Sequence, residues 1–268
     1  MRYSSDFDTL VEEYTRYRTS YSDELFDTVA GYIGRSSGKR VLDAACGTGL
    51  ATQGLIERGF LVTGIDVAER MLAVARVSAR KDANAAFYSA RAEALPFADG
   101  AFAGIICAQA FHWFDEARAL AEFARVLVDG GALAIFWKHA RSDDPYAQSV
   151  RALFTQWTGR SEAPMESSFR DSLAGFWGEV GRSGESRNDK LFADAELRML
   201  RFGLRYTVDS YVGYHRSREN LRLALGDQRE AFLDEVRQRI AALAPASGEF
   251  TVEQDQFLYL ARRRIAKS

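Results

Sequence analysis

Two carboxylates, each at the end of a short apolar run, are the residues of this chain with the clearest chemical potential. Asp43 ends the first run and is followed closely by Gly47 and Gly49, and Asp66 ends a second run at residues 60–65. Glycines let a backbone approach a ligand closely, and an acid at the end of the next strand can accept hydrogen bonds from both hydroxyls of a ribose. This spacing predicts a nucleoside-binding site.

The same stretch departs from two common nucleotide-binding patterns. A nicotinamide site would have a third glycine where this chain has Thr52, and no Gly-Lys-Ser/Thr sequence follows to form a P-loop. Asp43 lies four residues before Gly47, where its charge would repel a pyrophosphate. The carboxylate instead favours a cofactor with a cationic centre or an ammonium group.

Short apolar runs alternate with helical patterns between about residues 40 and 138. Repeated units of this kind predict a parallel sheet with helices on both faces, because each strand is then covered from both sides. The Gly130-Gly131 pair is expected to form the turn that begins the fifth strand. The predicted strands are 41–44, 61–65, 86–89, 104–108 and 133–137, and the predicted helices between them are 50–58, 69–79 and 115–127.

The flanking regions do not follow this alternation. A loop is predicted over the glycine- and serine-rich stretch 175–189, and the alternation at 197–206 is followed by a helix that begins at Asp209. The end of the chain, at 250–252 and 257–260, is expected to supply the last one or two strands. Further helices are predicted at 23–33, 146–158 and 229–243.

The composition is that of an ordinary folded protein. The chain has 268 residues, of which 47% are apolar and 27% charged, and a formal charge of −2, so no overall field attracts a polyanion. The basic stretch 262–264 is interpreted as a solvated strand end. Cys46 and Cys107 form no disulfide or metal-binding pattern. Without an apolar signal core or a long apolar run, we expect a cytoplasmic protein that does not enter the membrane.

Five segments together make the chain resemble a class I S-adenosylmethionine-dependent methyltransferase, clearly over residues 10–140 and more diffusely to the end. They are 41–49, 64–72, 92–102, 108–114 and 122–131. The sequence Gln-Ala-Phe-His-Trp-Phe at 109–114 is most similar to the small-molecule branch that includes trans-aconitate methyltransferase-like enzymes.

The resemblance implies an α/β fold with a Rossmann-like, seven-stranded, mostly parallel sheet and helices on both faces. It also implies a helical N-terminal lid and a helical and β-hairpin cap inserted after strand five. The expected division is 1–35 for the lid, 36–139 for the cofactor-binding core, 140–248 for the cap on the substrate side and 249–268 for the terminal strands that complete the sheet.

The resemblance also assigns roles in binding S-adenosylmethionine. Asp43 would contact the methionine half, Asp66 the ribose hydroxyls and Met71 the adenine face, while Gln109 would close over the sulfonium. Glu93 would lie beside the adenine edge. The full cofactor-binding set that it implies is Tyr14, Arg18, Asp43, Ala45, Gly47, Gly49, Asp66, Val67, Met71, Ala92, Glu93 and Gln109.

Two positions depart from the family's pattern. Ala45 replaces the usual glycine after the first acid, which costs little if its φ angle is negative. Arg91 stands where relatives often have an aspartate that accepts a hydrogen bond from the adenine amino group, and a guanidinium has only donors. We therefore expect adenine to be held by stacking, backbone groups or Glu93.

The acceptor side is less sharply defined. His112 and Trp113 follow the fourth strand, where open α/β sheets bind ligands, so His112 is the candidate general base or substrate orienter and Trp113 a candidate substrate contact. An aromatic cluster that packs a loop is an equal alternative. Tyr211 and His215, one helical turn apart, are further substrate candidates, unless they lie on an exposed helix face.

The expected reaction is an SN2 methyl transfer, for which alignment and desolvation supply much of the acceleration without a metal or a covalent intermediate. The expected acceptor is a small molecule, with oxygen (carboxylate or hydroxyl) favoured over nitrogen or carbon. No nucleic acid is expected, because no Asn-Pro-Pro-Tyr type motif follows strand four. The alternative is a catalytically silent S-adenosylmethionine-binding partner protein.

Aromatic residues after strand five could form a lid over an apolar acceptor. A second small core or a dimer surface would use the same residues, so both a monomer and a homodimer remain open. The residues are Trp157, Phe169, Phe176, Trp177 and Phe202.

Overall fold

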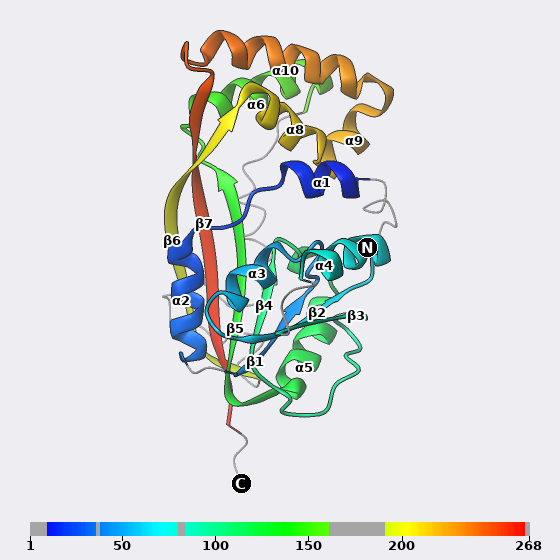
Figure 1. Ribbon diagram of the computed structural model, residues 1–268, viewed down its shortest axis with the longest axis vertical. Coiled ribbons are helices and arrows are strands. Elements are labelled where there is room, and N and C mark those ends of the chain that lie inside the picture. The colour runs from blue at the N-terminus through cyan, green and yellow to red at the C-terminus, as the bar shows by residue number, and fades with distance from the viewer. Residues whose placement is uncertain (1–9, 36–37, 80–83, 161–190, 266–268) are drawn as a thin grey trace.

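The structure is a computed structural model that describes residues 10–35, 38–79, 84–160 and 191–265. Its described strands form one seven-stranded sheet in the order β3-β2-β1-β4-β5-β7-β6. The first five strands are mutually parallel, whereas β7 is antiparallel to both β5 and β6. The expected seven-stranded, mostly parallel sheet is confirmed (Figure 1). Its strands are β1 (Arg40–Ala44), β2 (Leu61–Asp66), β3 (Ala85–Ser89), β4 (Phe102–Ala108), β5 (Leu127–Ala140), β6 (Phe192–Thr207) and β7 (Glu249–Arg263).

Helices cover both faces of the sheet, which explains why the central strands are almost continuously apolar. On one face, α2 (Asp23–Ile33) and α3 (Leu50–Ile56) pack on Val41, Ile106 and Phe136. On the other face, α5 (Glu116–Val126) packs on residues that include Leu42 and Ile105. The helix α4 (Glu69–Ser78) lies beside β2 and β3, and the 3₁₀ turn η2 (Phe111–Trp113) follows β4. No described helix is both long and apolar enough to cross a membrane.

A second apolar cluster forms at the far end of the sheet, where β6 and β7 extend beyond the other strands (Figure 1). Phe250 and Val252 of β7 pack there among the helices α6 (Pro145–Thr158), α8 (Val208–Arg216), α9 (Glu219–Leu225) and α10 (Arg229–Leu243). We call this unit the cap. Trp157 packs on Phe232 within it, at 5.8 Å between ring centroids, so it contributes to a second core. Phe169, Phe176 and Trp177, with the predicted loop 175–189, lie outside the described residues.

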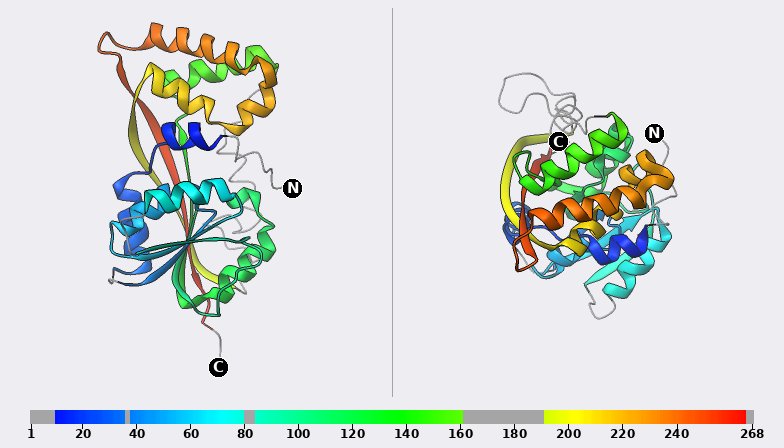
Figure 2. Two further views of the ribbon diagram at one scale, coloured as in Figure 1. Left: turned by 45° about the vertical axis from the view of Figure 1, so that its right-hand side comes forward. Right: turned by 90° about the horizontal axis from the view of Figure 1, so that it is seen from above.

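The N-terminal helix α1 (Val11–Tyr17) lies between the cap and the parallel part of the sheet, as both ribbon figures show (Figures 1 and 2). It packs mainly on α8 of the cap and more lightly on α4. Residues 18–22 then lead from α1 into α2.

Two local expectations were wrong or incomplete, and the expected one or two strands at the end of the chain prove to be one. The strand β5 begins at Leu127, and the Gly130-Gly131 pair lies inside it, where Gly130 has a φ of 70° and the pairing with β4 shifts register. The glycines therefore form a bulge rather than a turn before the strand. The end of the chain is a single strand, β7, and the helix α9 was not predicted.

The basic stretch at the end of β7 is not simply solvated. Arg262 donates hydrogen bonds to the carbonyls of Gly130 and Tyr32 and stacks on the Tyr32 ring, 4.1 Å from its centroid. Arg263 donates to the carbonyl of Leu127. These arginines satisfy backbone acceptors near the β5 bulge and the end of α2, which is a structural role.

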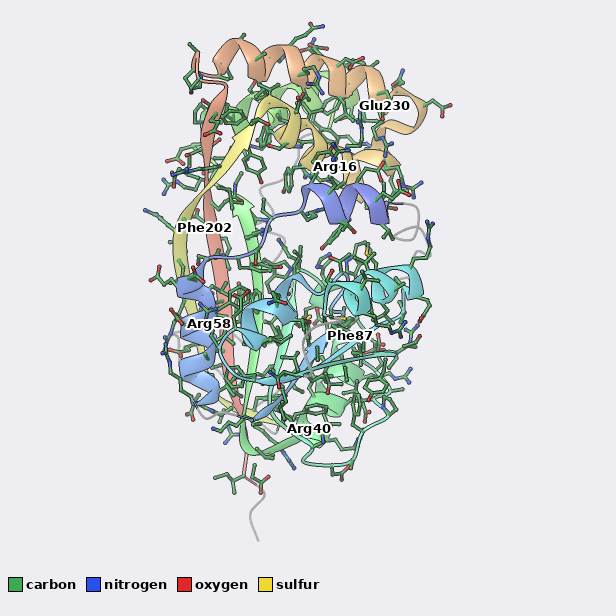
Figure 3. The ribbon with its side chains drawn as sticks, viewed as in Figure 1. Arg16, Arg40, Arg58, Phe87, Phe202 and Glu230 are labelled. Atoms are coloured by element: carbon green, nitrogen blue, oxygen red, sulfur yellow. The ribbon has the colours of Figure 1, made fainter. Side chains whose placement is uncertain are left out.

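The helices α2 and α3 approach each other closely at Gly54. A Cβ atom at this position would lie 2.4 Å from the Phe26 ring. Arg58, just beyond α3, reinforces the contact: it bonds Asp27 at 3.0 Å, and its guanidinium lies 5.2 Å from the centroid of the same ring (Figure 3).

We predict that Gly54→Ala lowers the free energy of unfolding by about 1–3 kcal/mol, because the buried Phe26 ring must move. The matched control is Gly31→Ala, also within a helix, where an added Cβ meets nothing within 4 Å. That variant should gain up to about 1 kcal/mol from helix propensity. Denaturant titration measures both, and equal stability of the two variants would contradict the packing argument.

Candidate functional site

A cavity opens at the carboxyl ends of β1, β4 and β5, where strands of an open α/β sheet present ligand-binding loops. The segment around α1 closes its other side. Six of the predicted cofactor-binding residues line this one cavity: Tyr14, Arg18, Asp43, Ala45, Gly47 and Gln109. The other lining residues, which include Thr19, Tyr21 and Lys138, were not predicted as cofactor-binding.

Asp43 has no solvent exposure, and its carboxyl group is only half satisfied within the described structure. Its Oδ2 accepts a hydrogen bond from the Thr52 hydroxyl at 2.6 Å, whereas Oδ1 is buried without a partner. Burial raises the pKa of Asp43 to about 7. Thr52, which breaks the glycine pattern of a nicotinamide site, is thus the residue that holds the acid in place.

The glycine turn after β1 is tied to the second carboxylate. The Gly47 amide donates to Asp66 Oδ2, and the Ala68 amide donates to Asp66 Oδ1, both at 2.9 Å. Ala45 has a φ of 59°, in the left-handed region, so the condition under which an alanine would cost little there is not met. An alanine there carries the steric cost that the family's usual glycine avoids.

Arg18 supplies the positive charge of the cavity. Its guanidinium lies 4.9 Å from the Tyr14 ring centroid and 5.3 Å from that of Tyr214, and it donates to the Ser217 carbonyl at 3.2 Å. Its buried Nε has no hydrogen-bond partner in the part of the chain that the structure describes. Burial raises the pKa of Tyr14, so its phenol stays protonated at neutral pH.

Gln109 and Lys138 form the wall between β4 and β5. Gln109 has a φ of 58°, its backbone amide donates to the Phe136 carbonyl at 2.9 Å, and its side-chain amide donates to the Lys138 carbonyl at 3.0 Å. The Lys138 side chain is buried among polar atoms of the segment after α1. Burial, with a smaller effect of Arg18, lowers the pKa of this amine to about 7.

The other predicted cofactor residues lie outside the lining of this cavity, along the neighbouring edge of the sheet. Asp66 and Val67 are half-buried at the end of β2, and Met71 and Ala92 are buried. Gly49 precedes α3 with a φ of 86°. The hydrogen bond from Gly47 to Asp66 joins this edge to the cavity.

Glu93 serves the protein's own packing. Its Oε1 accepts from the Asp115 amide at 3.0 Å, just before α5, and its Oε2 lies 3.4 Å from Arg91 Nε. Arg91 thus faces a carboxylate at the position where relatives often have an aspartate. This arrangement favours stacking and backbone groups over Glu93 as the means of holding adenine.

His112 and Trp113 lie in η2 and do not line the cavity. Trp137 Nε1 donates to His112 Nδ1 at 3.4 Å, and burial lowers the pKa of His112 to about 4. The pKa of His112 thus lies well below the ordinary near-neutral value of an imidazole. An imidazole with Nδ1 as acceptor carries its proton on Nε2, which makes His112 a hydrogen-bond donor and a weak base.

Tyr211 and His215 are buried in the cap cluster and do not line the cavity either. Their rings meet edge to face at 4.7 Å, and His215 Nδ1 lies 3.5 Å from Arg218. Burial holds the pKa of His215 well below its ordinary value. Neither lies on an exposed helix face, and their packing explains them without a substrate.

Residues 42–135 match the family model described as a methyltransferase domain. This part of the chain is thus similar to methyltransferase domains.

Two curated relatives illustrate how far the similarity extends. An uncharacterized methyltransferase of Mycobacterium tuberculosis is 37% identical over 134 residues, which are 50% of this chain and 52% of the relative. A demethylmenaquinone methyltransferase of Thermus thermophilus is 46% identical over 101 residues, 36% of this chain and 46% of the relative. The matches to these proteins span about half of their length.

A solved structure shares the fold of this chain. A putative type II methyltransferase from Anaeromyxobacter dehalogenans superimposes with a TM-score of 0.64 and 23% identity. The alignment covers 94% of this chain and 100% of the other. At this level of identity the likeness concerns the fold alone.

The left-handed conformation of Ala45 leads to a stability prediction. We predict that Ala45→Gly raises the free energy of unfolding by up to about 1 kcal/mol, because relief of left-handed strain exceeds the entropy cost of a more flexible unfolded chain. The control Ala121→Gly, on the exposed side of α5, should lose about 1 kcal/mol. Thermal unfolding of the two variants checks the sign, and a loss in both would show that Ala45 is unstrained.

Proposed function

We propose that this protein transfers a methyl group from S-adenosylmethionine to a small-molecule acceptor. The observation that carries the proposal is one cavity lined by two buried, incompletely paired groups of opposite charge. Asp43 has a buried oxygen without a partner, and Arg18 has a buried nitrogen without one, within the described residues. The methionine half of the cofactor carries an ammonium and a carboxylate, which these two groups match.

With the methionine half of S-adenosylmethionine in this position, the proposed roles of the remaining cofactor-binding residues follow. Asp66, already held by two backbone amides, would accept from the ribose hydroxyls. Met71 and the backbone of Ala92 would meet the adenine, beyond the edge of β2. Gln109, locked by its bonds to β5, would lie over the sulfonium. When bound, S-adenosylmethionine supplies an electrophilic methyl group on sulfur.

The titratable groups of the cavity favour an acceptor that is already nucleophilic at neutral pH. Tyr14 and Tyr21 have raised pKa values, and Lys138 is engaged with backbone oxygens. His112, the proposed substrate orienter, is a weak base. A carboxylate oxygen needs no base, whereas a hydroxyl or an amine must lose a proton. We therefore propose a carboxylate oxygen as the acceptor atom, with a hydroxyl next and a nitrogen or carbon atom as the alternative.

Trp113 in η2 and Tyr211 and His215 in the cap keep only weaker proposed roles on the acceptor side, because none of them lines the cavity. The trans-aconitate methyltransferase-like branch fits a carboxylate acceptor. A catalytically silent S-adenosylmethionine-binding partner protein remains the second candidate. The match to the demethylmenaquinone methyltransferase covers only 46% of that relative, so its activity does not carry over to this chain.

Turnover distinguishes these candidates. The purified chain, incubated with S-adenosylmethionine and a panel of small carboxylic acids, phenols and amines, should release S-adenosylhomocysteine and give a product one CH₂ heavier. A methyl ester would lose methanol in mild alkali, whereas a methyl ether or a methylamine would not. Binding of the cofactor without turnover on any acceptor would favour the silent partner.

Asp43 makes cofactor binding depend on pH. Because its pKa in the free protein is about 7, the carboxylate must lose a proton before it can attract an ammonium group. The affinity for S-adenosylmethionine should therefore fall as the pH drops below about 7, by up to about tenfold per pH unit. Isothermal titration calorimetry between pH 5.5 and 8, values chosen to bracket that pKa by roughly one unit, measures it.

The control for this pH dependence is Asp43→Asn, which should bind weakly with a much flatter profile. Lys138, with a pKa also near 7, still titrates in this variant, so any remaining slope belongs to it or to another group. An unchanged slope in Asp43→Asn would remove Asp43 from the ammonium site. Asp66→Ala tests the ribose end: it should lower affinity at every pH without flattening the profile.

A further inference from the structure

Residues 19–22, which we call the crossing segment, lie between α1 and α2 and cross β5 near its end and β7 near its middle (Figure 1). Two side chains from these strands hold it. Lys138 Nζ donates to the Thr19 carbonyl, to Thr19 Oγ1 at 2.9 Å and to the Ser20 carbonyl at 2.6 Å. Ser22 Oγ donates to Gln256 Oε1 at 2.5 Å. Lys138 and Gln256 are direct partners in the β5–β7 ladder, so the two contacts arise side by side.

The Lys138 amine has a hydrogen-bonding partner for each of its protons. A lysine is rarely buried to this extent, with 7% of its surface exposed, because an unpaired ammonium would be costly. Its three N–H donors meet three oxygen acceptors, and the Tyr21 ring lies 4.8 Å away for a cation–π contact. The amine therefore binds the chain itself rather than a ligand.

The crossing segment forms a wall of the cavity. Thr19 and Tyr21 line it, and Arg18 immediately precedes them. Tyr21 packs edge to face on Phe136, at 4.9 Å between centroids. The Lys138 carbonyl also receives the side-chain amide of Gln109. One lysine thus fixes the crossing segment on one side and the β4–β5 wall on the other.

We infer that Lys138, supported by Gln256, is a positioning residue that fixes Arg18 and the crossing segment as a preformed wall of the S-adenosylmethionine cavity. The inference rests on the proposed function, because it assigns the cavity to that cofactor. Lys138 touches the wall and not the reacting atoms. Its loss should therefore weaken cofactor binding and leave the chemical step intact.

The test is Lys138→Met, which keeps the length of the side chain and removes its donors. Calorimetry should show the Kd for S-adenosylmethionine rising by about tenfold or more, in proportion to the loss of two or three hydrogen bonds to a charged group. Hydrogen exchange should become faster at residues 14–22 of the free chain. Once an acceptor is known, the KM for the cofactor should rise while kcat stays within about twofold.

The matched control is Lys39→Met. Lys39 is half-buried and donates one hydrogen bond, to the Ile33 carbonyl at 3.2 Å, away from the cavity. This variant should bind the cofactor as the unmodified chain does, even if its stability falls. Equal Kd values for Lys138→Met and the unmodified chain would overturn the inference, as would a loss of kcat at constant KM.

If Lys138→Met does not fold, Thr19→Val provides the second test. It keeps the shape of the side chain but removes the hydroxyl that accepts from Lys138 and is also hydrogen-bonded to Tyr206. The Kd should rise by about threefold, which corresponds to roughly half the free energy of an average hydrogen bond. An unchanged Kd in this variant would count against the inference. Failure of the unmodified chain to bind S-adenosylmethionine would instead overturn the proposed function. Hydrogen exchange of the free chain would still show whether Lys138 fixes the crossing segment.

Discussion

The fully buried carboxylate of Asp43 is the constraint around which the cavity is built. An acid without solvent must either find hydrogen-bond donors or stay protonated. The Thr52 hydroxyl, from α3, donates one hydrogen bond to this carboxylate. The burial that this bond does not offset raises the pKa of Asp43. The other oxygen stays available for a positively charged group. A buried acid in this state is costly to the free protein, and a cationic ligand would relieve that cost, which couples binding to proton release.

The opposite charge reaches the cavity by a different route. Asp43 is fixed by the central sheet, whereas Arg18 comes from the end of α1, outside the sheet, and lies between two tyrosine rings. Its placement depends on the crossing segment and hence on Lys138. Asp43 and Arg18 are thus supported unequally. Asp43 is part of the buried strand β1, whereas Arg18 is held by a few side-chain contacts outside the sheet.

The sequence was informative where structure is local. The β1–α3–β2 unit is encoded by apolar runs, by glycines and by acids at strand ends, and α2 and α10 begin and end at the expected residues. The left-handed φ of Ala45 was not foreseen, because an alanine gives no sign that its backbone is strained. The low pKa of His112 was missed because it comes from burial, which depends on distant residues such as Trp137.

Lys138 is the clearest case of what sequence reasoning could not find. A lysine near the end of an apolar strand resembles a solvated strand end, and no motif surrounds it. Its partners Thr19 and Ser20 are more than a hundred residues away, so the contact exists only in the folded chain. Arg262 was misinterpreted for the same reason, since its acceptors lie on other elements.

The long strand β7 belongs to two cores at once. Its first residues, Phe250 and Val252, are part of the cap cluster, while Leu258 and Leu260 are part of the core beneath α2. The ladder with β5 runs without interruption from Ala132 to Ala140, and that with β6 reaches Thr207. A cap mounted on an unbroken sheet cannot swing away as a rigid body, because backbone hydrogen bonds would have to break. Within the described structure, the short chain between α1 and α2 is therefore the cavity wall that can move without breaking these ladders.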